Sequence, residues 1–293
     1  MKLKVGTRGS NLAKIQATAV VNILKEAGLD AEIVIISTKG DRVQHLPIHK
    51  VGKNGVFVGE LEGALREGAV DIAVHSLKDM PSKIAPGFTL APPPAAPADV
   101  DVFVGTGDKF REEDLASMVV ATGSNRRIAQ LKHFYPDVKI VPIRGNVETR
   151  INKVESGLAD GTLLAYAGLL RAGLSHKATA ELDPTRFIPS PSQGLLGIEL
   201  AEDRRDLLKV FTQASDPRAA FRMKMERAFQ RALSASCASP IGIHIEEQGD
   251  GILLHGCFAK TVEDPLIYAK VATTKEKAQE DVFELVRKVN GNE

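Results

Sequence analysis

Tryptophan is absent from this 293-residue chain, aromatic residues make up only 5% of it, and cysteine occurs just twice. Two cysteines cannot build the disulfide framework of a small secreted domain, and such scarcity is typical of a reducing compartment. No run of about 18 apolar residues occurs, which argues against a membrane-spanning helix. No apolar signal segment follows Met1, so we expect a cytoplasmic protein without a membrane partner.

Net charge is also nearly absent. The 38 basic and 37 acidic residues leave a formal charge of +1, whereas domains that bind nucleic acids normally carry a marked basic excess. We therefore expect no nucleic-acid partner, although a local basic cleft is compatible with this balance. The seven histidines show no metal-ligand spacing with either cysteine, so we expect no metal.

Hydrophobic periodicity predicts alternating strands and helices, followed by a C-terminal part with a different order of elements. Strands are predicted at 3–7, 32–37, 70–75, 119–122, 138–143, 163–166 and 197–200, and helices at 11–27, 58–67, 124–134, 146–155 and 167–172. The C-terminal part predicts a helix at 217–233, strands at 242–247, 251–259 and 266–273, and a helix at 275–289. This pattern indicates α/β units followed by a small α+β unit with an antiparallel sheet.

Two proline-rich stretches, 91–99 and 183–193, interrupt the α/β pattern. Proline resists helices and central strands, so we interpret both stretches as crossings between domains. The expected fold is a pair of similar, doubly wound α/β domains around a cleft, plus the small third domain. The expected boundaries are 1–94 with 194–213 for the first domain, 98–189 for the second and 216–293 for the third.

Arginines gather where predicted strands end and helices begin. They occur in three segments: Thr7-Arg8-Gly9-Ser10, Thr122-Gly123-Ser124-Asn125-Arg126-Arg127 and Arg144-Gly145-Asn146-Val147-Glu148-Thr149-Arg150. Ligands of open α/β sheets bind at the carboxyl ends of strands, and arginine suits carboxylate recognition. The segments favour a ligand with several carboxylates or a phosphate chain. Simpler interpretations are a helix cap by Ser10 and solvated surface arginines.

The segment after the predicted strand 70–75 holds Ser76, Lys78 and Asp79. A carboxylate at this position could move protons on a substrate, although Lys78 and Asp79 could equally form a surface pair. His75 is interpreted as a packed or hydrogen-bonded residue.

Cys237 lies on a loop of small residues between a predicted helix and a predicted strand. Such a loop leaves the sulfur open to carry a bulky group. Cys257, inside the predicted strand 251–259, is interpreted as a core thiol.

Six ordered segments resemble the porphobilinogen deaminase (hydroxymethylbilane synthase) family, over essentially the whole chain. They are Thr-Arg-Gly-Ser at 7–10, Lys-Val-Gly-Lys-Asn-Gly-Val-Phe-Val-Gly-Glu-Leu-Glu at 50–62, Asp-Ile-Ala-Val-His-Ser-Leu-Lys-Asp-Met-Pro at 71–81, Gly-Ser-Asn-Arg-Arg at 123–127, Ile-Arg-Gly-Asn-Val-Glu-Thr-Arg at 143–150 and Cys-Ala-Ser-Pro-Ile-Gly at 237–242. The resemblance implies periplasmic-binding-protein-like domains and a monomer. It also implies a transferase of tetrapyrrole and heme biosynthesis that joins four porphobilinogen units head to tail, with loss of ammonia, to give hydroxymethylbilane.

The resemblance further implies a dipyrromethane cofactor, bound to Cys237 through a thioether, and Asp79 as the catalytic carboxylate. The residues expected to bind the cofactor are Ser10, Lys78, Asp79, Ser124, Arg126, Arg127 and Arg144. Those expected to bind substrate are Arg8, Gln16, Arg144, Arg150, Arg171 and Gln193. Lys50, Lys53 and Phe57 are expected in a lid.

The chain departs from the family pattern at three places. Ala235 and Ser236 replace two glycines before the cysteine, and Asn54 takes the usual place of the lid lysine, which here is Lys53 one position earlier. The family's Thr-Ser-Ser-Leu-Arg-Arg segment reads Thr-Gly-Ser-Asn-Arg-Arg at 122–127.

Two other functions are compatible with parts of the sequence. A non-catalytic carboxylate-binding protein of the two-lobed solute-binding type would need neither Cys237 nor Asp79. A Cys-His acyl-transfer enzyme would need a reactive free thiol at Cys237, whereas the family resemblance implies a blocked one.

Overall fold

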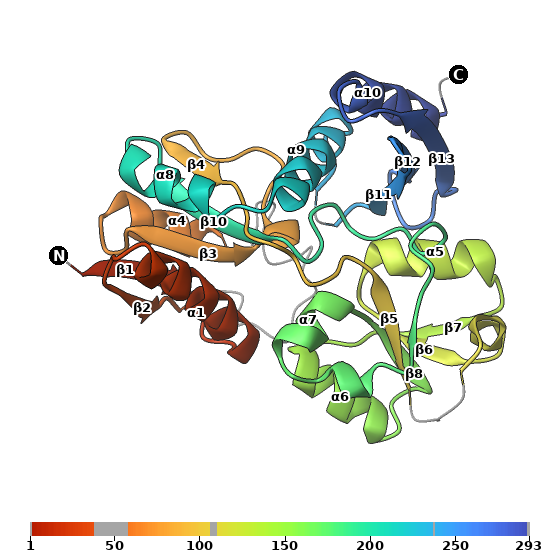
Figure 1. Ribbon diagram of the computed structural model, residues 1–293. Coiled ribbons are helices and arrows are strands. Elements are labelled where there is room, and N and C mark those ends of the chain that lie inside the picture. The colour runs from red at the N-terminus through yellow and green to blue at the C-terminus, as the bar shows by residue number, and fades with distance from the viewer. Residues whose placement is uncertain (1, 38–57, 106–109, 237, 292–293) are drawn as a thin grey trace. The chain divides into compact units, whose positions relative to one another are not determined.

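The computed structural model describes residues 2–37, 58–105, 110–236 and 238–291 (Figure 1). The chain divides into two compact units, one of residues 1–97 with 194–223 and the other of residues 98–193 with 224–293. The chain changes unit after Pro97 and after Gln193, both within the predicted proline-rich crossings, and again after Met223. The second unit includes the C-terminal residues, and the boundaries of three separate domains stay a prediction.

The first unit contains a five-stranded sheet of order β2-β1-β3-β10-β4. Its strands are β1 (Leu3–Thr7), β2 (Ala31–Ile35), β3 (Ile72–Ser76), β4 (Phe88–Ala91) and β10 (Leu196–Ala201). β1 runs parallel to β2 and β3, whereas β10 runs antiparallel to both β3 and β4.

The second unit repeats this arrangement in a sheet of order β7-β6-β8-β5-β9. Its strands are β5 (Asp101–Gly105), β6 (Val119–Ala121), β7 (Lys139–Val141), β8 (Gly161–Ala165) and β9 (Ala180–Glu181). β6 is parallel to β7 and β8, and β5 is antiparallel to β8 and β9. In each sheet the antiparallel fourth strand, β10 or β5, is the strand that follows a crossing. The expectation of two similar α/β sheets is therefore confirmed.

Helices cover both faces of each sheet, as alternation along the strands requires. In the first unit they are α1 (Asn11–Glu26), α4 (Gly59–Arg66) and α8 (Arg205–Gln213), and in the second α5 (Asn125–Phe134), α6 (Val147–Glu155) and α7 (Tyr166–Arg171). On β3, Val74 packs in the core formed with α1 and α8, and Ala73 packs in the core formed with α4. On β5, Phe103 packs with α5, and Val104 packs with α6 and α7.

The C-terminal part forms a separate three-stranded antiparallel sheet, as predicted. It follows α9 (Pro217–Ala232) and consists of β11 (Ile241–Gln248), β12 (Gly251–Phe258) and β13 (Ile267–Thr273), with α10 (Ala278–Val289) after it. α10 packs closely on β12, since a Cβ on Gly256 would lie 2.9 Å from the Leu285 side chain. None of the described helices is long and apolar enough to cross a membrane.

The sequence did not predict β4, β5, β9 and α8, nor the short 3₁₀ helices η1 (Leu77–Asp79), η2 (Glu112–Ala116) and η3 (Ser175–Lys177). β4 and β5 flank the proline-rich stretch 91–99, and β9 is a two-residue strand that exists through its pairing with β5. α8 has the spacing of a helix at Leu207 and Phe211, which are both 1% exposed, but its flanking residues are mostly charged or polar.

The ring of Phe103 fills the space that a side chain at residue 161 would need. A Cβ on Gly161 would lie 2.1 Å from Cζ of Phe103, whose side chain is 2% exposed. We expect Gly161→Ala to lower the free energy of unfolding by about 1–3 kcal/mol, because overpacking forces the buried ring to move. Urea titration measures this difference.

Gly63→Ala in α4 is the control, since an added Cβ there meets nothing within 4 Å and alanine is the better helix former. Equal unfolding free energies for Gly161→Ala and the wild-type chain would contradict the packing argument.

Candidate active site

The predicted site residues of the first unit lie at the carboxyl edge of its sheet. β1 and β3 are parallel neighbours, with Val5 opposite Ile72, so the segments that follow them emerge at the same edge. These segments carry Arg8 and Ser10 after β1, and Lys78 and Asp79 after β3. β10 begins at this edge, because Leu196 is paired with Ser76.

Ser10 and Gln16 each have a hydrogen-bond partner within the first unit. The Ser10 hydroxyl accepts a hydrogen bond from the backbone N–H of Ala13 at 3.3 Å and caps α1, as the simpler interpretation held. Gln16 is 4% exposed, and its side-chain nitrogen donates to the Ser76 hydroxyl at 3.0 Å. Gln16 therefore joins α1 to the end of β3, where Lys78 and Asp79 follow.

A single 3₁₀ turn, η1 (Leu77–Asp79), presents Lys78 and Asp79. Leu77 and Met80 are each 1% exposed and anchor the turn, and the backbone N–H of Leu77 donates to the Leu195 carbonyl at 3.1 Å. Lys78 is half-buried and Asp79 is exposed. The Asp79 carboxylate is thus accessible on a firmly held turn, as a group that exchanges protons with a substrate must be.

The predicted site residues of the second unit lie at the equivalent edge of its own sheet. Ser124 follows β6 and Arg144 follows β7, and these strands are parallel neighbours. Asp101, the first residue of β5, is at this edge because it is paired with Ala165, the last residue of β8. Ser124 is the N-cap of α5, and its side chain makes no capping hydrogen bond to the described residues.

Arg126 and Arg127, on the first turn of α5, are 4% and 5% exposed. Arg126 Nη1 lies 2.9 Å from Asp101 Oδ2, and Arg127 Nη2 lies 2.8 Å from Asp101 Oδ1. The interpretation of these arginines as solvated surface residues is therefore wrong. Their contact with a cofactor stays a prediction.

Asp101 is a functional candidate that no sequence motif indicated. Burial alone would raise its pKa, but the charges of Arg126 and Arg127 outweigh burial and hold the pKa of Asp101 well below its usual range. Gln193 adds a third donor, with its side-chain nitrogen 2.9 Å from Asp101 Oδ1. One sequence signal could have found Asp101, namely that an acidic residue directly precedes the apolar segment 102–104. An acid next to a buried strand is itself buried, and a buried carboxylate needs a cation.

The other predicted arginines of the second unit, Arg144, Arg150 and Arg171, are half-buried. Arg150 Nε donates to the Gly145 carbonyl at 2.8 Å, which folds the side chain back over the start of α6. Burial lowers the pKa of Arg171 to about 10, so this side chain remains protonated at neutral pH. Positive charge thus follows both β7 and β8.

Cys237 and the predicted lid residues Lys50, Lys53 and Phe57 lie outside the described residues. The neighbours of Cys237 are described, and they explain two departures from the family pattern. Ala235 is 4% exposed, so its methyl group is packed. The Ser236 hydroxyl accepts a hydrogen bond from the backbone N–H of Ala238 at 3.2 Å, which a glycine could not do.

Asn125, in the segment 122–127 that also departs from the family pattern, contacts this loop as well. Its side-chain nitrogen donates to the Ala238 carbonyl at 2.8 Å, across 113 residues of sequence. A leucine at this position, as in the family pattern, has no donor. Asn125 therefore connects the first turn of α5 to the residue after Cys237.

The interpretations of Cys257 and His75 are confirmed. Cys257 is fully buried, and burial raises the pKa of its thiol to about 12, so it is inert. His75 Nε2 lies 3.1 Å from Oε2 of the buried Glu199. In the part of the chain that the structure describes, no three His, Cys, Asp or Glu side chains gather as a metal site.

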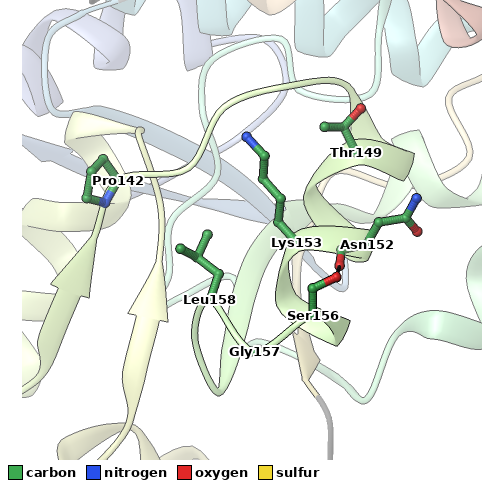
Figure 2. Close-up of a pocket in the computed structure, with 7 residues that line it drawn as sticks. All are labelled: Pro142, Thr149, Asn152, Lys153, Ser156, Gly157 and Leu158. Atoms are coloured by element: carbon green, nitrogen blue, oxygen red, sulfur yellow. Dashed lines mark hydrogen bonds between the residues drawn. The ribbon is translucent and has the colours of Figure 1, made fainter.

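A hollow of about 600 Å³ lies over α6 and the turn after it (Figure 2). Its lining residues are Pro142, Thr149, Asn152, Lys153, Ser156, Gly157 and Leu158. Lys153 Nζ donates to the Arg144 carbonyl at 3.0 Å, but the lining includes none of the predicted site residues. We assign no function to this hollow.

The bond from Asn125 to Ala238 can be tested without any ligand. Asn125→Asp keeps the shape of the side chain and favours the start of α5, because a negative charge suits a helix N-terminus, but it removes the donor. We expect amide hydrogen exchange at Ser236, Ala238 and Ser239 to become about 2–10 times faster, the equivalent of one hydrogen bond of about 0.5–1.5 kcal/mol. Exchange within α5 should not accelerate. Unchanged exchange at these three residues would show that the bond does not hold the loop.

Comparison with known proteins identifies the family. The family model described as porphobilinogen deaminase, dipyromethane cofactor binding domain, matches residues 3–209. A porphobilinogen deaminase of Lachnospira eligens is 42% identical over 258 residues, which cover 86% of this chain and 87% of that protein. A probable porphobilinogen deaminase of Hyperthermus butylicus is 39% identical over 263 residues, covering 88% and 86%.

Among solved structures, the periplasmic VFT2 domain of Bordetella pertussis BvgS is similar at a TM-score of 0.44 and 18% identity, covering 73% of this chain and 86% of that one. The sequence matches are far stronger than this likeness of fold. They span both sheet edges with their arginines and Asp79, and on their extent and identity the chain belongs to the porphobilinogen deaminase family.

Proposed function

We propose that this chain is a hydroxymethylbilane synthase. It joins four porphobilinogen units head to tail, with release of ammonia, on a dipyrromethane attached to Cys237, and releases the linear tetrapyrrole by hydrolysis. The observation that carries the proposal is the buried Asp101-Arg126-Arg127 cluster at the carboxyl edge of the second sheet. Membership of the family supplies the identity of the substrate and cofactor.

The cluster fits a group rich in carboxylates. Two buried guanidinium cations share one carboxylate, so one positive charge is left over within the cluster. Nε of Arg126 is buried and has no hydrogen-bond partner among the described residues. A buried charge and an unpaired donor are both unfavourable unless an anion is close. A carboxylate of dipyrromethane would compensate both.

The remaining cations extend this binding role to the growing chain. Each porphobilinogen unit carries two carboxylates, and Arg144, Arg150 and Arg171 provide positive charge after β7 and β8. Holding the carboxylates fixes the reacting carbons next to each other. Such positioning can lower much of the activation barrier of a reaction between two molecules. When bound, the dipyrromethane supplies the free pyrrole carbon that receives the first unit.

Asp79 is the proposed catalytic carboxylate. Loss of ammonia from the aminomethyl group of porphobilinogen leaves positive charge on the pyrrole, and the new carbon–carbon bond releases one proton from the receiving ring carbon. An accessible carboxylate can stabilise that charge and accept that proton. Asp79 would act once for every unit added.

The proposal includes finer expectations from the sequence. Ser10, Lys78, Ser124 and Arg127 would contribute to the cofactor site, and Arg8, Gln16 and Gln193 to the substrate site. Lys50, Lys53 and Phe57 would belong to a lid. Family resemblance supports a monomer, and the two-cysteine composition supports a cytoplasmic enzyme. The near-zero net charge supports the absence of a nucleic-acid partner, and the lack of a long apolar run supports the absence of a membrane partner.

Intact-protein mass spectrometry tests the proposed attachment. Protein made in cells that synthesise porphobilinogen should carry an added mass of two linked pyrrole units, and Cys237→Ser should lack it. Cys257→Ala is the matched control and should keep the adduct, since this thiol is buried in the core. An unmodified Cys237 would contradict the proposal. A free thiol that reacts readily with alkylating agents would favour acyl transfer, and an inert one a carboxylate-binding protein.

The role of Asp79 has its own test. We expect Asp79→Asn to keep the adduct but to reduce formation of hydroxymethylbilane by about 100-fold or more, the usual range for loss of an acid–base group. Asp30→Asn is the control, because Asp30 is also an exposed acid of the first unit but precedes β2, at the opposite edge of the sheet. Near-normal turnover of Asp79→Asn would remove Asp79 from the mechanism.

A further inference from the structure

We propose that Asp101 is a positioning residue of the cofactor site. Its carboxylate holds Arg127 and Gln193 in place, and it fixes Arg126 so that Nε of Arg126 can donate a hydrogen bond to a cofactor carboxylate. This inference rests on the proposed function, because it concerns the same cofactor. Of the two arginines, Arg127 would build the site and Arg126 would bind the cofactor.

Arg127 is occupied entirely by the protein. Its Nε and Nη2 donate to the two oxygens of Asp101 at 3.1 and 2.8 Å, and its Nη1 donates to the Leu163 carbonyl of β8 at 2.7 Å. This is the bidentate geometry in which an arginine and a carboxylate orient each other most strictly. All three guanidinium nitrogens have acceptors, so Arg127 acts on a ligand through Asp101.

Arg126 is only partly occupied. Its Nη1 faces Asp101 Oδ2 at 2.9 Å, the Ile188 carbonyl at 2.9 Å and the Gln130 side-chain oxygen at 3.1 Å. Its Nε, on a side chain that is 4% exposed, has no partner among the described residues. Three acceptors thus hold one end of the guanidinium, and the unpaired donor lies on the same rigid plane. This is the arrangement expected of a side chain held ready for an anion.

Gln193 connects the same carboxylate to a crossing between the units. Its side-chain nitrogen donates to Asp101 Oδ1 at 2.9 Å and to the Asp99 carbonyl at 2.6 Å. Asp99 is the second residue after the chain first enters the second unit, and Gln193 is the last residue before it returns to the first unit. Through Gln193, Asp101 therefore connects these two segments of the second unit to the arginine pair.

The charge of Asp101 is what makes this arrangement possible. The positive neighbours hold the pKa of Asp101 well below its usual range, although burial opposes this. The stability that the Asp101 carboxylate contributes is therefore present above the pKa of aspartate in the unfolded chain, which is about 3.9. That stability is lost as the pH falls below this value. An asparagine of the same shape would leave two buried cations without a counter-charge.

The test follows cofactor loading in the full-length chain. Protein made without porphobilinogen is incubated with porphobilinogen, and the adduct is measured by intact mass over time and over substrate concentration. We expect Asp101→Asn to load at least ten times more slowly and to need a higher porphobilinogen concentration for half-maximal rate. Asp160→Asn is the charge-matched control: Asp160 accepts the Val119 N–H at 2.7 Å at the opposite edge of this sheet, and this variant should load normally.

A double variant separates positioning from folding. Asp101→Asn with Arg127→Gln removes one charge of each sign, so it should unfold at a higher temperature than Asp101→Asn. It should still load slowly, because Arg126 has lost the carboxylate that fixes it. Normal loading by either Asp101 variant would overturn the proposal, as would a double variant in which loading recovers together with stability. If the wild-type chain itself acquires no adduct, the proposed function fails, and this outcome is distinct from a failure of the role of Asp101.

Stability against pH provides an independent measurement. The difference in unfolding free energy between the wild-type chain and Asp101→Asn should be constant from pH 8 to pH 5 and should shrink below about pH 4, where unfolded aspartate takes up its proton. No difference at pH 7 would show that the carboxylate is not paired and would overturn the proposal.

Discussion

The ion pairs between Asp101 and the two arginines of α5 are the interaction on which the second unit's sheet edge depends. A carboxylate and two guanidinium groups are removed from water together, and the cost of burying each is offset only by the others. Removing the carboxylate would leave two buried positive charges without a counter-charge. Asp101 is on β5 and both arginines are on α5, and the neutral side chain of Gln193, just before β10, donates to the same carboxylate. Asp101 therefore fixes how these three segments meet.

The repeated sheet topology explains why this carboxylate is at the carboxyl edge of its sheet. In each unit, the strand that follows a crossing is inserted antiparallel between parallel neighbours, so its beginning lies beside the carboxyl ends of those neighbours. In the second unit this beginning is Asp101, which holds the arginines. In the first unit it is the approach to β10, where the Leu195 carbonyl holds the turn that carries Asp79. The same topological position therefore supports predicted site residues in both units.

Much of this could be predicted from the sequence, for identifiable reasons. Long segments with clear periodicity, such as α1 and the three C-terminal strands, were predicted closely, because their apolar spacing is independent of the rest of the chain. β5 was not predicted, because it follows a run of prolines and exists through its pairing with β8. Asp101 was missed with it. Its partners Arg126 and Arg127 were noticed, but a sequence cannot show that arginines on a first helical turn face inward.

The departures from the family pattern show how a site can change its means of support. Two glycines before the attachment cysteine would leave the loop free in backbone conformation. Here Ala235 is packed, Ser236 bonds to the backbone of Ala238, and Asn125 bonds to the carbonyl of the same residue. The substitutions on α5 and in the loop are far apart in sequence but meet at Ala238, so they are best understood as one change in the structure.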